Sequence, residues 1–274
     1  MLIETLSTFP HMYDSVMGES MMKRAQEKGI LEFRAHDLRD WTHDRHRTTD
    51  DDPYGGGAGL VMKCDPIFEA VEAILGKEFV EAKLAAAPPQ GESQQRSSAA
   101  PQIVFLAPQG RPFDDSYADK LAAADHLLFI CGHYEGIDER VYALADHVIS
   151  LGDYVLTSGE LASMVVIDAA VRKLPGVLGA ADGPVDESFT SGLLEYPQYT
   201  RPAAFRGMRV PEVLTSGNHA AIARWRREQS LARTAAARPD LIAAAEAAGR
   251  LAPADQKFLK LLEPAPTGAA EGVS

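Results

Sequence analysis

The chain has 274 residues, 46% of them hydrophobic and 24% charged, a composition typical of a folded, water-soluble protein. It contains no run of about 18 apolar residues, which argues against a transmembrane helix. Its net charge of −12 argues against a protein that coats nucleic acid with its whole surface.

Short apolar runs alternate with helical patterns through the first two thirds of the chain. We expect strands at 2–6, 31–36, 103–106, 127–131 and 147–151, and helices at 20–28, 65–75, 114–124 and 138–145. A further helix is expected to run to about Arg172 from a capping box, with Thr157 as N-cap and Glu160 returning to its backbone N–H. The alternation predicts an α/β domain with a mainly parallel sheet.

Changes of composition indicate the domain boundaries. Residues 85–101 are rich in Pro, Ser and Gln and predict a flexible surface insertion. Residues 179–192 are rich in Gly, acidic and hydroxyl side chains, which is typical of a linker. We therefore predict an α/β domain over 1–178, a linker over 179–192 and a small all-helical domain over 193–274.

The two cysteines, Cys64 and Cys131, belong to no CxxC pair and no cluster of metal ligands. The histidines at 11, 36, 43 and 46 likewise form no H-x-x-x-H pair, so no metal site is expected. The first residues lack a basic segment followed by an apolar one. Reduced cysteines in a cytoplasmic protein are the expectation.

The chain carries a local excess of arginine despite its acidic total. Residues 201–240 hold eight arginines, no lysine and three acidic residues. A solvated helix face would explain this composition, and so would a phosphate-binding surface, because the guanidinium group binds phosphate through two parallel hydrogen bonds.

Three glycine-bearing loops follow three predicted strands: 106–110, 132–136 and 151–156. Ligands of open α/β sheets lie beyond the carboxyl ends of the strands. Three ordinary strand-to-helix turns would look similar, but together the loops favour a shared binding site. Residues 50–59 (DDDPYGGGAG) lack the Lys-Ser/Thr of a P-loop, and we expect them to adapt to a substrate.

The sequence resembles the bacterial tRNA (guanine-N1-)-methyltransferases. The resemblance rests on PYGGGAG at 53–59, CGHYEGIDER at 131–140, GDYVL at 152–156, YTRP at 199–202, VP at 210–211, VLTSG at 213–217 and WR at 225–226. These motifs occur in the family's order between about residues 2 and 241.

The resemblance implies a trefoil-knotted fold of the SPOUT type, a homodimer, and S-adenosylmethionine bound in the knot. It implies an active site between the knot of one subunit and the C-terminal domain of the other. The implied cofactor-binding residues are Leu106, Ala107, Pro108, Gln109, Gly110, Gly132, Leu151, Gly152, Asp153, Tyr154, Val155 and Leu156. The family also suggests a divalent ion, Mg²⁺, and its target is N1 of guanosine 37 in tRNA.

The resemblance also implies roles in catalysis and in RNA binding. In the family an Asp before a Ser-Phe pair is the general base, but here Glu187 precedes Ser188-Phe189 and Asp186 is one place earlier. Either carboxylate could therefore be the base, with Glu187 preferred. Arg172 matches the family's arginine that stabilises charge on guanine O6. Glu135 matches a contact to the target guanine, and Arg201, Arg226 and Arg233 are candidate tRNA contacts.

Two alternatives remain at the level of sequence. One is a knotted methyltransferase that acts on another RNA base or on a ribose 2′-hydroxyl. The other is a tRNA-binding protein without activity, which only the replacement of Asp by Glu187 favours. The complete set of cofactor loops argues against the second alternative.

Overall fold

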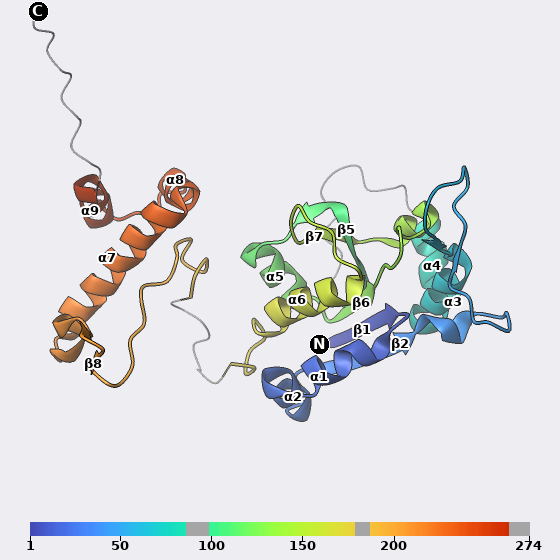
Figure 1. Cartoon of the computed structure of the whole chain (residues 1–274), viewed down its shortest axis with the longest axis horizontal. Coiled ribbons are helices and arrows are strands. Elements are labelled where there is room, and N and C mark those ends of the chain that lie inside the picture. Colours follow the sequence, from blue (N-terminus) through green and yellow to red (C-terminus); the bar gives the residue numbers. More distant parts are fainter. Residues whose placement is uncertain (86–98, 179–186, 263–274) are drawn as a thin grey trace, which may run out of the picture. The chain divides into compact units, whose positions relative to one another are not determined.

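The computed structural model describes residues 1–85, 99–178 and 187–262, and the chain divides into two compact units, Met1–Gly183 and Pro184–Ser274 (Figure 1). The predicted flexible insertion at 85–101 and the predicted linker at 179–192 lie largely outside the described residues. In the described part of the chain, no helix is long and apolar enough to cross a membrane.

The first unit is built on a five-stranded sheet in the order β2-β1-β6-β5-β7, with every neighbouring pair parallel. The strands are β1 (Leu2–Ser7), β2 (Glu32–Asp37), β5 (Gln102–Pro112), β6 (His126–Ile130) and β7 (His147–Ser150). A separate antiparallel pair consists of β3 (Asp50–Asp51) and β4 (Val61–Met62). The expected mixed α/β class with a mainly parallel sheet is confirmed.

Helical segments of the first unit are η1 (Pro10–Tyr13), α1 (Asp14–Met17), α2 (Ser20–Glu27), η2 (Leu38–Trp41), α3 (Cys64–Leu75), α4 (Lys77–Ala85), α5 (Asp115–Ala122), η3 (Glu139–Leu144) and α6 (Gly159–Val171). The α-helix expected at 138–145 is instead the 3-10 helix η3. Its Val141 N–H donates to the carbonyl of Asp138 at 3.0 Å, an i→i+3 bond. Helix α4 was not predicted, because it runs directly into the segment interpreted as an insertion.

Helices cover both faces of the sheet, and the strands β1, β5, β6 and β7 alternate between two cores. Val104 and Phe129 pack with α2, α5 and α6, whereas Phe105 and Ile130 pack with α3, α4 and η3. Adjacent side chains of a strand point to opposite faces, so each short apolar run supplies both cores. This explains why these strands are continuously apolar in the sequence.

Strand β5 is interrupted where the first glycine-bearing loop was expected. Leu106 and Arg111 both pair with Ile149 of β7, so residues 107–110 form a loop between two paired positions of one strand. The expected strand at 103–106 is therefore correct but incomplete, because pairing resumes after the loop.

The second unit contains α7 (His219–Ala237), α8 (Pro239–Ala247), α9 (Pro253–Leu262), the 3-10 helix η4 (Glu212–Thr215) and the strands β8 (Ala204–Phe205) and β9 (Met208–Arg209). The β8–β9 hairpin corrects the expectation of an all-helical domain. Its turn residues Arg206 and Gly207 have φ of 51° and 81°, as a two-residue hairpin turn requires.

The helices of this unit enclose a small core of Leu193, Leu231, Ala245 and Leu251. The Asp255 carboxylate at the start of α9 accepts two hydrogen bonds from Arg227 on α7, at 3.1 and 2.7 Å. These bonds lower the pKa of Asp255. One of the arginines of the basic segment therefore has a structural role.

A buried histidine makes the stability of the first unit depend on pH. His147 is 4% exposed; its Nδ1 accepts from the Tyr117 hydroxyl at 3.0 Å and its Nε2 donates to Gln102 Oε1 at 2.8 Å. This pattern fits a neutral ring, and burial lowers the pKa of His147 from 6.5 to about 4.

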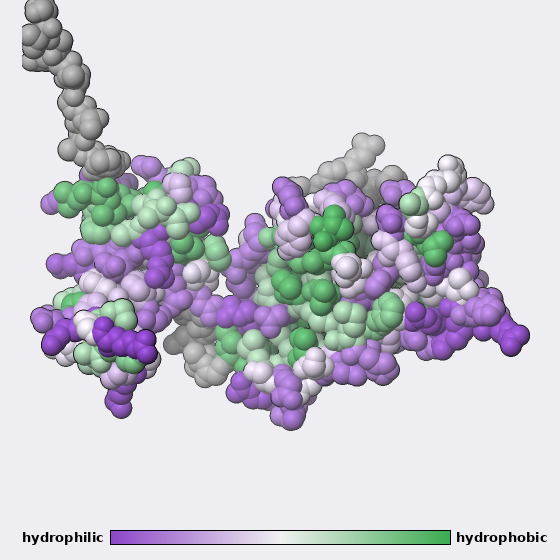
Figure 2. Space-filling model, in the orientation of Figure 1, coloured by the Kyte–Doolittle hydropathy of each residue, from purple (hydrophilic) through white to green (hydrophobic). Residues whose placement is uncertain are grey.

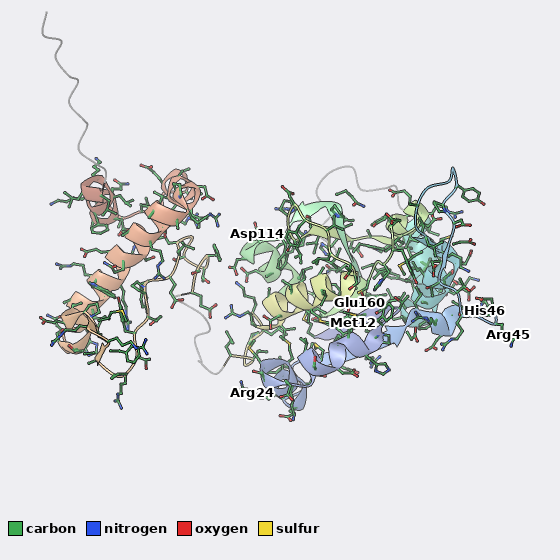
Figure 3. The ribbon with its side chains drawn as sticks, viewed as in Figure 1. Met12, Arg24, Arg45, His46, Asp114 and Glu160 are labelled. Carbon is green, nitrogen blue, oxygen red and sulfur yellow. The ribbon has the colours of Figure 1, made fainter. Side chains whose placement is uncertain are left out.

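The unfolded chain takes up a proton at this site between pH 6.5 and 4, whereas the folded protein does not, so folded stability falls as pH falls through this range. The free energy of unfolding of the wild type should fall between pH 7 and pH 5. We predict that in His147→Gln this fall is smaller by about 1–2 kcal/mol. Urea unfolding at both pH values measures this. The exposed His46 (Figure 3) supplies the control His46→Gln, which should follow the wild type; equal pH dependence in all three proteins would contradict the prediction.

Candidate active site

A cavity of about 340 Å³ lies beyond the carboxyl ends of β5, β6 and β7. Its lining comprises Leu106, Ala107, Pro108, Gln109, Gly132, His133, Tyr134, Glu135, Gly136, Ile137, Glu139, Tyr142, Ile149, Ser150, Leu151, Gly152, Tyr154, Val155, Leu156, Thr157, Ser158, Gly159 and Ala162. The three glycine-bearing loops therefore meet at one site, as expected for an open parallel sheet.

Glycines permit the close approach of backbones around this cavity. A Cβ at Gly110 would lie 2.5 Å from the backbone nitrogen of Ile149, and one at Gly159 would lie 2.7 Å from the nitrogen of Gly132. The Gly159 N–H donates to the carbonyl of Gly132 at 2.8 Å. The start of α6 is thus held directly against the loop that follows β6.

Glu160 lies at the N-terminal end of α6 (Figure 3) and is fully buried. The expectation that it closes a capping box with Thr157 is wrong, because the N-cap is Ser158 and its side chain makes no capping bond. The Glu160 carboxylate instead accepts from the hydroxyl of Ser7 and pairs with Nε2 of His133 at 3.1 Å. A buried carboxylate needs such partners, and they connect β1, α6 and the cavity.

The glycine-rich segment at 53–59 lies against the loop that carries Glu135. The N–H of Glu135 donates to the carbonyl of Leu60 at 3.1 Å, and the Met62 N–H donates to the carbonyl of Gly136 at 2.9 Å. A Cβ at Gly59, where φ is +82°, would overlap the Glu135 side chain. Glycine is therefore required at 59, and the two segments form one surface beside the cavity.

The lining has the character of a small-ligand site. Apolar side chains and exposed loop backbone surround it, and the buried hydroxyl of Ser158 has no hydrogen-bond partner among the described residues. No group of three or more His, Cys, Asp or Glu side chains in the described ranges could hold a metal ion.

The second unit has cavities of its own. The larger one, about 410 Å³, is lined by Tyr196, Pro197, Gln198, Tyr199, Thr200, Arg201, Ala203, Val210, Leu214, Thr215, Ile222, Trp225 and Arg226. The rings of Tyr199 and Trp225 lie 6.3 Å apart, and the Arg226 guanidinium lies 4.8 Å from the ring centre of Tyr196. Aromatic faces beside guanidinium groups are typical of surfaces that bind unpaired bases.

Glu187 is half-buried and lines a neighbouring cavity of about 230 Å³ together with Arg226 and Arg227. Arg226 and Tyr196 border both cavities of this unit. The structure thus brings the preferred candidate base together with a candidate tRNA contact.

The remaining predicted site residues lie elsewhere. Gly110 and Asp153 belong to the loops of the first cavity but not to its lining. Arg172 is the half-buried C-cap of α6, and Arg233 donates to the carbonyl of Glu195 at 3.1 Å. Asp186 lies outside the described residues.

Sequence reasoning did not assign Ser158 and Ala162 to the site. It expected the loop 132–136 there, and with it His133, but gave the His133 side chain no role. Nothing in the sequence indicates the direction of the Ser158 side chain, because a serine before a helix ordinarily caps it.

The first unit is thus an α/β protein with glycine-bearing loops beyond its strand ends, the place where open α/β sheets bind their ligands. The family model described as tRNA (Guanine-1)-methyltransferase TrmD matches residues 1–244. The chain belongs to this family.

Curated relatives agree with this assignment over nearly the whole length. The tRNA (guanine-N(1)-)-methyltransferase of Symbiobacterium thermophilum is 52% identical over 246 residues, 90% of this chain and 93% of the relative. That of Limosilactobacillus reuteri is 50% identical over 90% of this chain and 91% of the relative. The enzyme of Geotalea uraniireducens is 48% identical over 96% of this chain and 97% of the relative. The family resemblance expected from the motifs is confirmed.

The contact between Gly159 and Gly132 predicts a specific defect. Gly159→Ala should lower the free energy of unfolding by about 1–3 kcal/mol, because the new methyl group overlaps backbone atoms, and should weaken binding of S-adenosylmethionine at least about tenfold. Isothermal titration calorimetry and urea unfolding measure the two effects.

Gly29→Ala is the matched control, because Gly29 has φ of +67° but open space around its Cβ position. It should lower stability modestly and leave binding unchanged. Equal affinities of the two variants would show that the close approach does not shape the cavity.

Proposed function

We propose that this chain transfers a methyl group from S-adenosylmethionine to N1 of guanosine 37 in tRNA. The observation that carries the proposal is that the three loops 106–110, 132–136 and 151–156 meet around one cavity, in a chain that belongs to the tRNA (Guanine-1)-methyltransferase family. The relatives' names supply the base and the atom, and the family resemblance supplies position 37.

The residues of the first cavity fit the methyl donor. Leu106, Leu156 and Ala162 offer apolar surface for an adenosine, while the amides and carbonyls of the loops offer polar partners. When bound, the donor supplies an electrophilic methyl carbon attached to a positively charged sulfur. The loops hold it and exclude water from one of its sides.

The acceptor needs help from the protein, because guanine N1 carries a proton at neutral pH. We assign the general base to Glu187, whose carboxylate takes the N1 proton as the N1–methyl bond forms and the methyl–sulfur bond breaks. The sulfur keeps the bond's electron pair and becomes neutral. Arg172 stabilises the negative charge that develops on O6.

The RNA-binding part of the proposal rests on the second unit. Tyr199, Trp225 and Arg201 line its larger cavity, and Arg226 lies between the two cavities. Stacking surfaces next to guanidinium groups suit an anticodon loop, whose bases are unpaired. Glu135, at the rim of the donor cavity, is assigned to the target guanine.

The trefoil knot is part of the proposal through the family resemblance alone. The homodimer is also supported by an exposed apolar surface. Helix α6 is apolar on nearly all sides, and Leu161 and Val165, one turn apart, are 43% and 55% exposed. Apolar residues also cover much of the face around α6 and the η1–α1 segment (Figure 2), where Phe9 and Met12 are exposed. A helix that is apolar all round is normally covered, and a second copy of the chain would cover this face.

The activity is tested by transfer of labelled methyl groups to an unmodified tRNA with guanosines at positions 36 and 37. We predict transfer to this tRNA and none when position 37 is adenosine. Glu187→Gln should slow transfer at least about 100-fold, the usual effect of removing a general base. Addition of EDTA to the same assay tests the expected divalent ion.

Glu246→Gln, which removes an exposed carboxylate on α8, is the control and should behave as the wild type. Loss of activity in Asp186→Asn alone would move the base by one residue and keep the function. Binding of S-adenosylmethionine without transfer by the wild type would refute guanine N1 as the acceptor. Transfer to another nucleotide would identify a different knotted RNA methyltransferase.

The dimer is tested by placing a charged residue on the face of α6 that we expect a second copy of the chain to cover. Val165→Glu should convert the protein to a monomer in light scattering, because a carboxylate would be buried against apolar side chains. Leu84→Glu places the same charge on an exposed leucine of α4 and should not change the mass. A wild-type monomer, or dimers of both variants, would contradict this surface.

A further inference from the structure

Glu160 is a fully buried carboxylate next to the wall of the donor cavity, the cavity beyond β5, β6 and β7. It is the second residue of α6 (Figure 3), and its neighbours Gly159 and Ala162 line the cavity, although Glu160 itself does not. One carboxylate oxygen pairs with Nε2 of His133 at 3.1 Å. His133 is a lining residue whose side chain is 15% exposed. The carboxylate is therefore in direct contact with a residue of the cavity wall.

The hydrogen bonds around Glu160 fit the ionised form of its side chain. The Ser7 hydroxyl accepts from the Phe9 N–H at 2.8 Å, so its own proton is free to donate to the Glu160 carboxylate. An ionised carboxylate only accepts hydrogen bonds, so the bond from His133 requires a proton on Nε2. The first turn of a helix also stabilises a negative charge. Glu160 therefore carries a negative charge inside the fold.

Little positive charge balances this carboxylate in the described part of the chain. There, no lysine or arginine pairs with Glu160, and none lines the donor cavity. The other acidic residues of the lining, Glu135 and Glu139, are negative as well. A neutral His133 ring satisfies the bond to Glu160, because this bond needs only the proton on Nε2. The described surroundings of the cavity thus carry a net negative charge.

The methyl donor changes its charge during the reaction. S-adenosylmethionine carries a positive charge on sulfur, whereas the product, S-adenosylhomocysteine, has a neutral sulfur and is otherwise charged in the same way. Opposite charges attract each other through a protein wall without contact, and salt screens a buried charge much less than an exposed one. A negative wall therefore favours the donor over the product.

We infer that the buried charge of Glu160 makes the donor cavity selective for the cationic methyl donor over its product with a neutral sulfur. This inference rests on the proposed function, since it requires S-adenosylmethionine in this cavity. Glu160 acts through its electric field and needs no contact with either ligand, so it is a specificity-determining residue and not a catalytic one. The attraction assists binding of the donor and ends when the methyl group has left, so the product dissociates more readily.

The inference predicts that Glu160→Gln separates ligands by their charge. The amide keeps the shape of the side chain and can still bond to Ser7 and His133. Two charges about 10 Å apart at an effective dielectric constant of about 20 change a binding constant roughly 10-fold. In calorimetry the Kd of S-adenosylmethionine should thus rise about 10-fold, and that of S-adenosylhomocysteine less than about twofold. Sinefungin, which carries an ammonium group in place of the methylated sulfur, should behave as the donor does.

His133→Arg is a second variant, because it keeps Glu160 and adds a positive charge that pairs with it. It should lower the preference for the cationic ligands as well. Glu4→Gln is the matched control. Glu4 is another buried carboxylate bound to histidines, 2.9 Å from His36 and 2.7 Å from His126, and none of these three residues lines the cavity. This variant should keep the preference of the wild type.

An equal loss of affinity for all three ligands in Glu160→Gln would show a purely structural role and overturn the inference. An unchanged preference in both variants would overturn it too, and either result leaves the proposed function intact. Should Glu160→Gln not fold, the preference of His133→Arg decides. A wild-type protein that binds none of the three ligands would overturn the proposed function, and the inference with it.

Discussion

The backbone contact between Gly132 and Gly159 connects the sheet to the binding loops. A hydrogen bond of 2.8 Å joins the two glycines. A Cβ at position 159 would overlap the backbone of the loop after β6, so the start of α6 could then not lie this close to the loop. The next residue, Glu160, extends this connection to Ser7 at the end of β1 and to His133 in the cavity wall. The shape of this cavity therefore depends on Gly159, which lines it, and on the buried carboxylate of Glu160, which does not.

The chemistry we propose is divided between the two units. The first contributes a cavity that holds a methyl donor between backbone segments, with few charged side chains in its lining. The second contributes Glu187 and Arg226 around one cavity and the neighbouring rings of Tyr199 and Trp225 in the next. Holding an electrophile needs shape and desolvation, whereas activating guanine N1 needs a base and a cation. The distribution of residue types follows this difference.

Local patterns were sufficient for the five strands of the main sheet and for the helices α2, α3, α5 and α6, because an apolar run between glycine or polar residues has few other interpretations. They also placed the three loops, since parallel strands end at one edge. Contacts between distant segments could not be predicted. The direction of Glu160 depends on Ser7, 153 residues away, and the fit of Gly59 to Glu135 depends on a loop from another part of the chain. The β8–β9 hairpin was missed because two-residue strands carry no periodic pattern.

The central claim is that the three loops form the binding site of the methyl donor. Hydrogen–deuterium exchange of the full chain, with and without S-adenosylmethionine, tests it most directly. The account predicts slower exchange in 106–110, 132–136 and 151–156 when the donor is present, and unchanged exchange in α3 (Cys64–Leu75), which does not line the cavity. Binding of the donor with protection elsewhere, and none in these loops, would contradict the account.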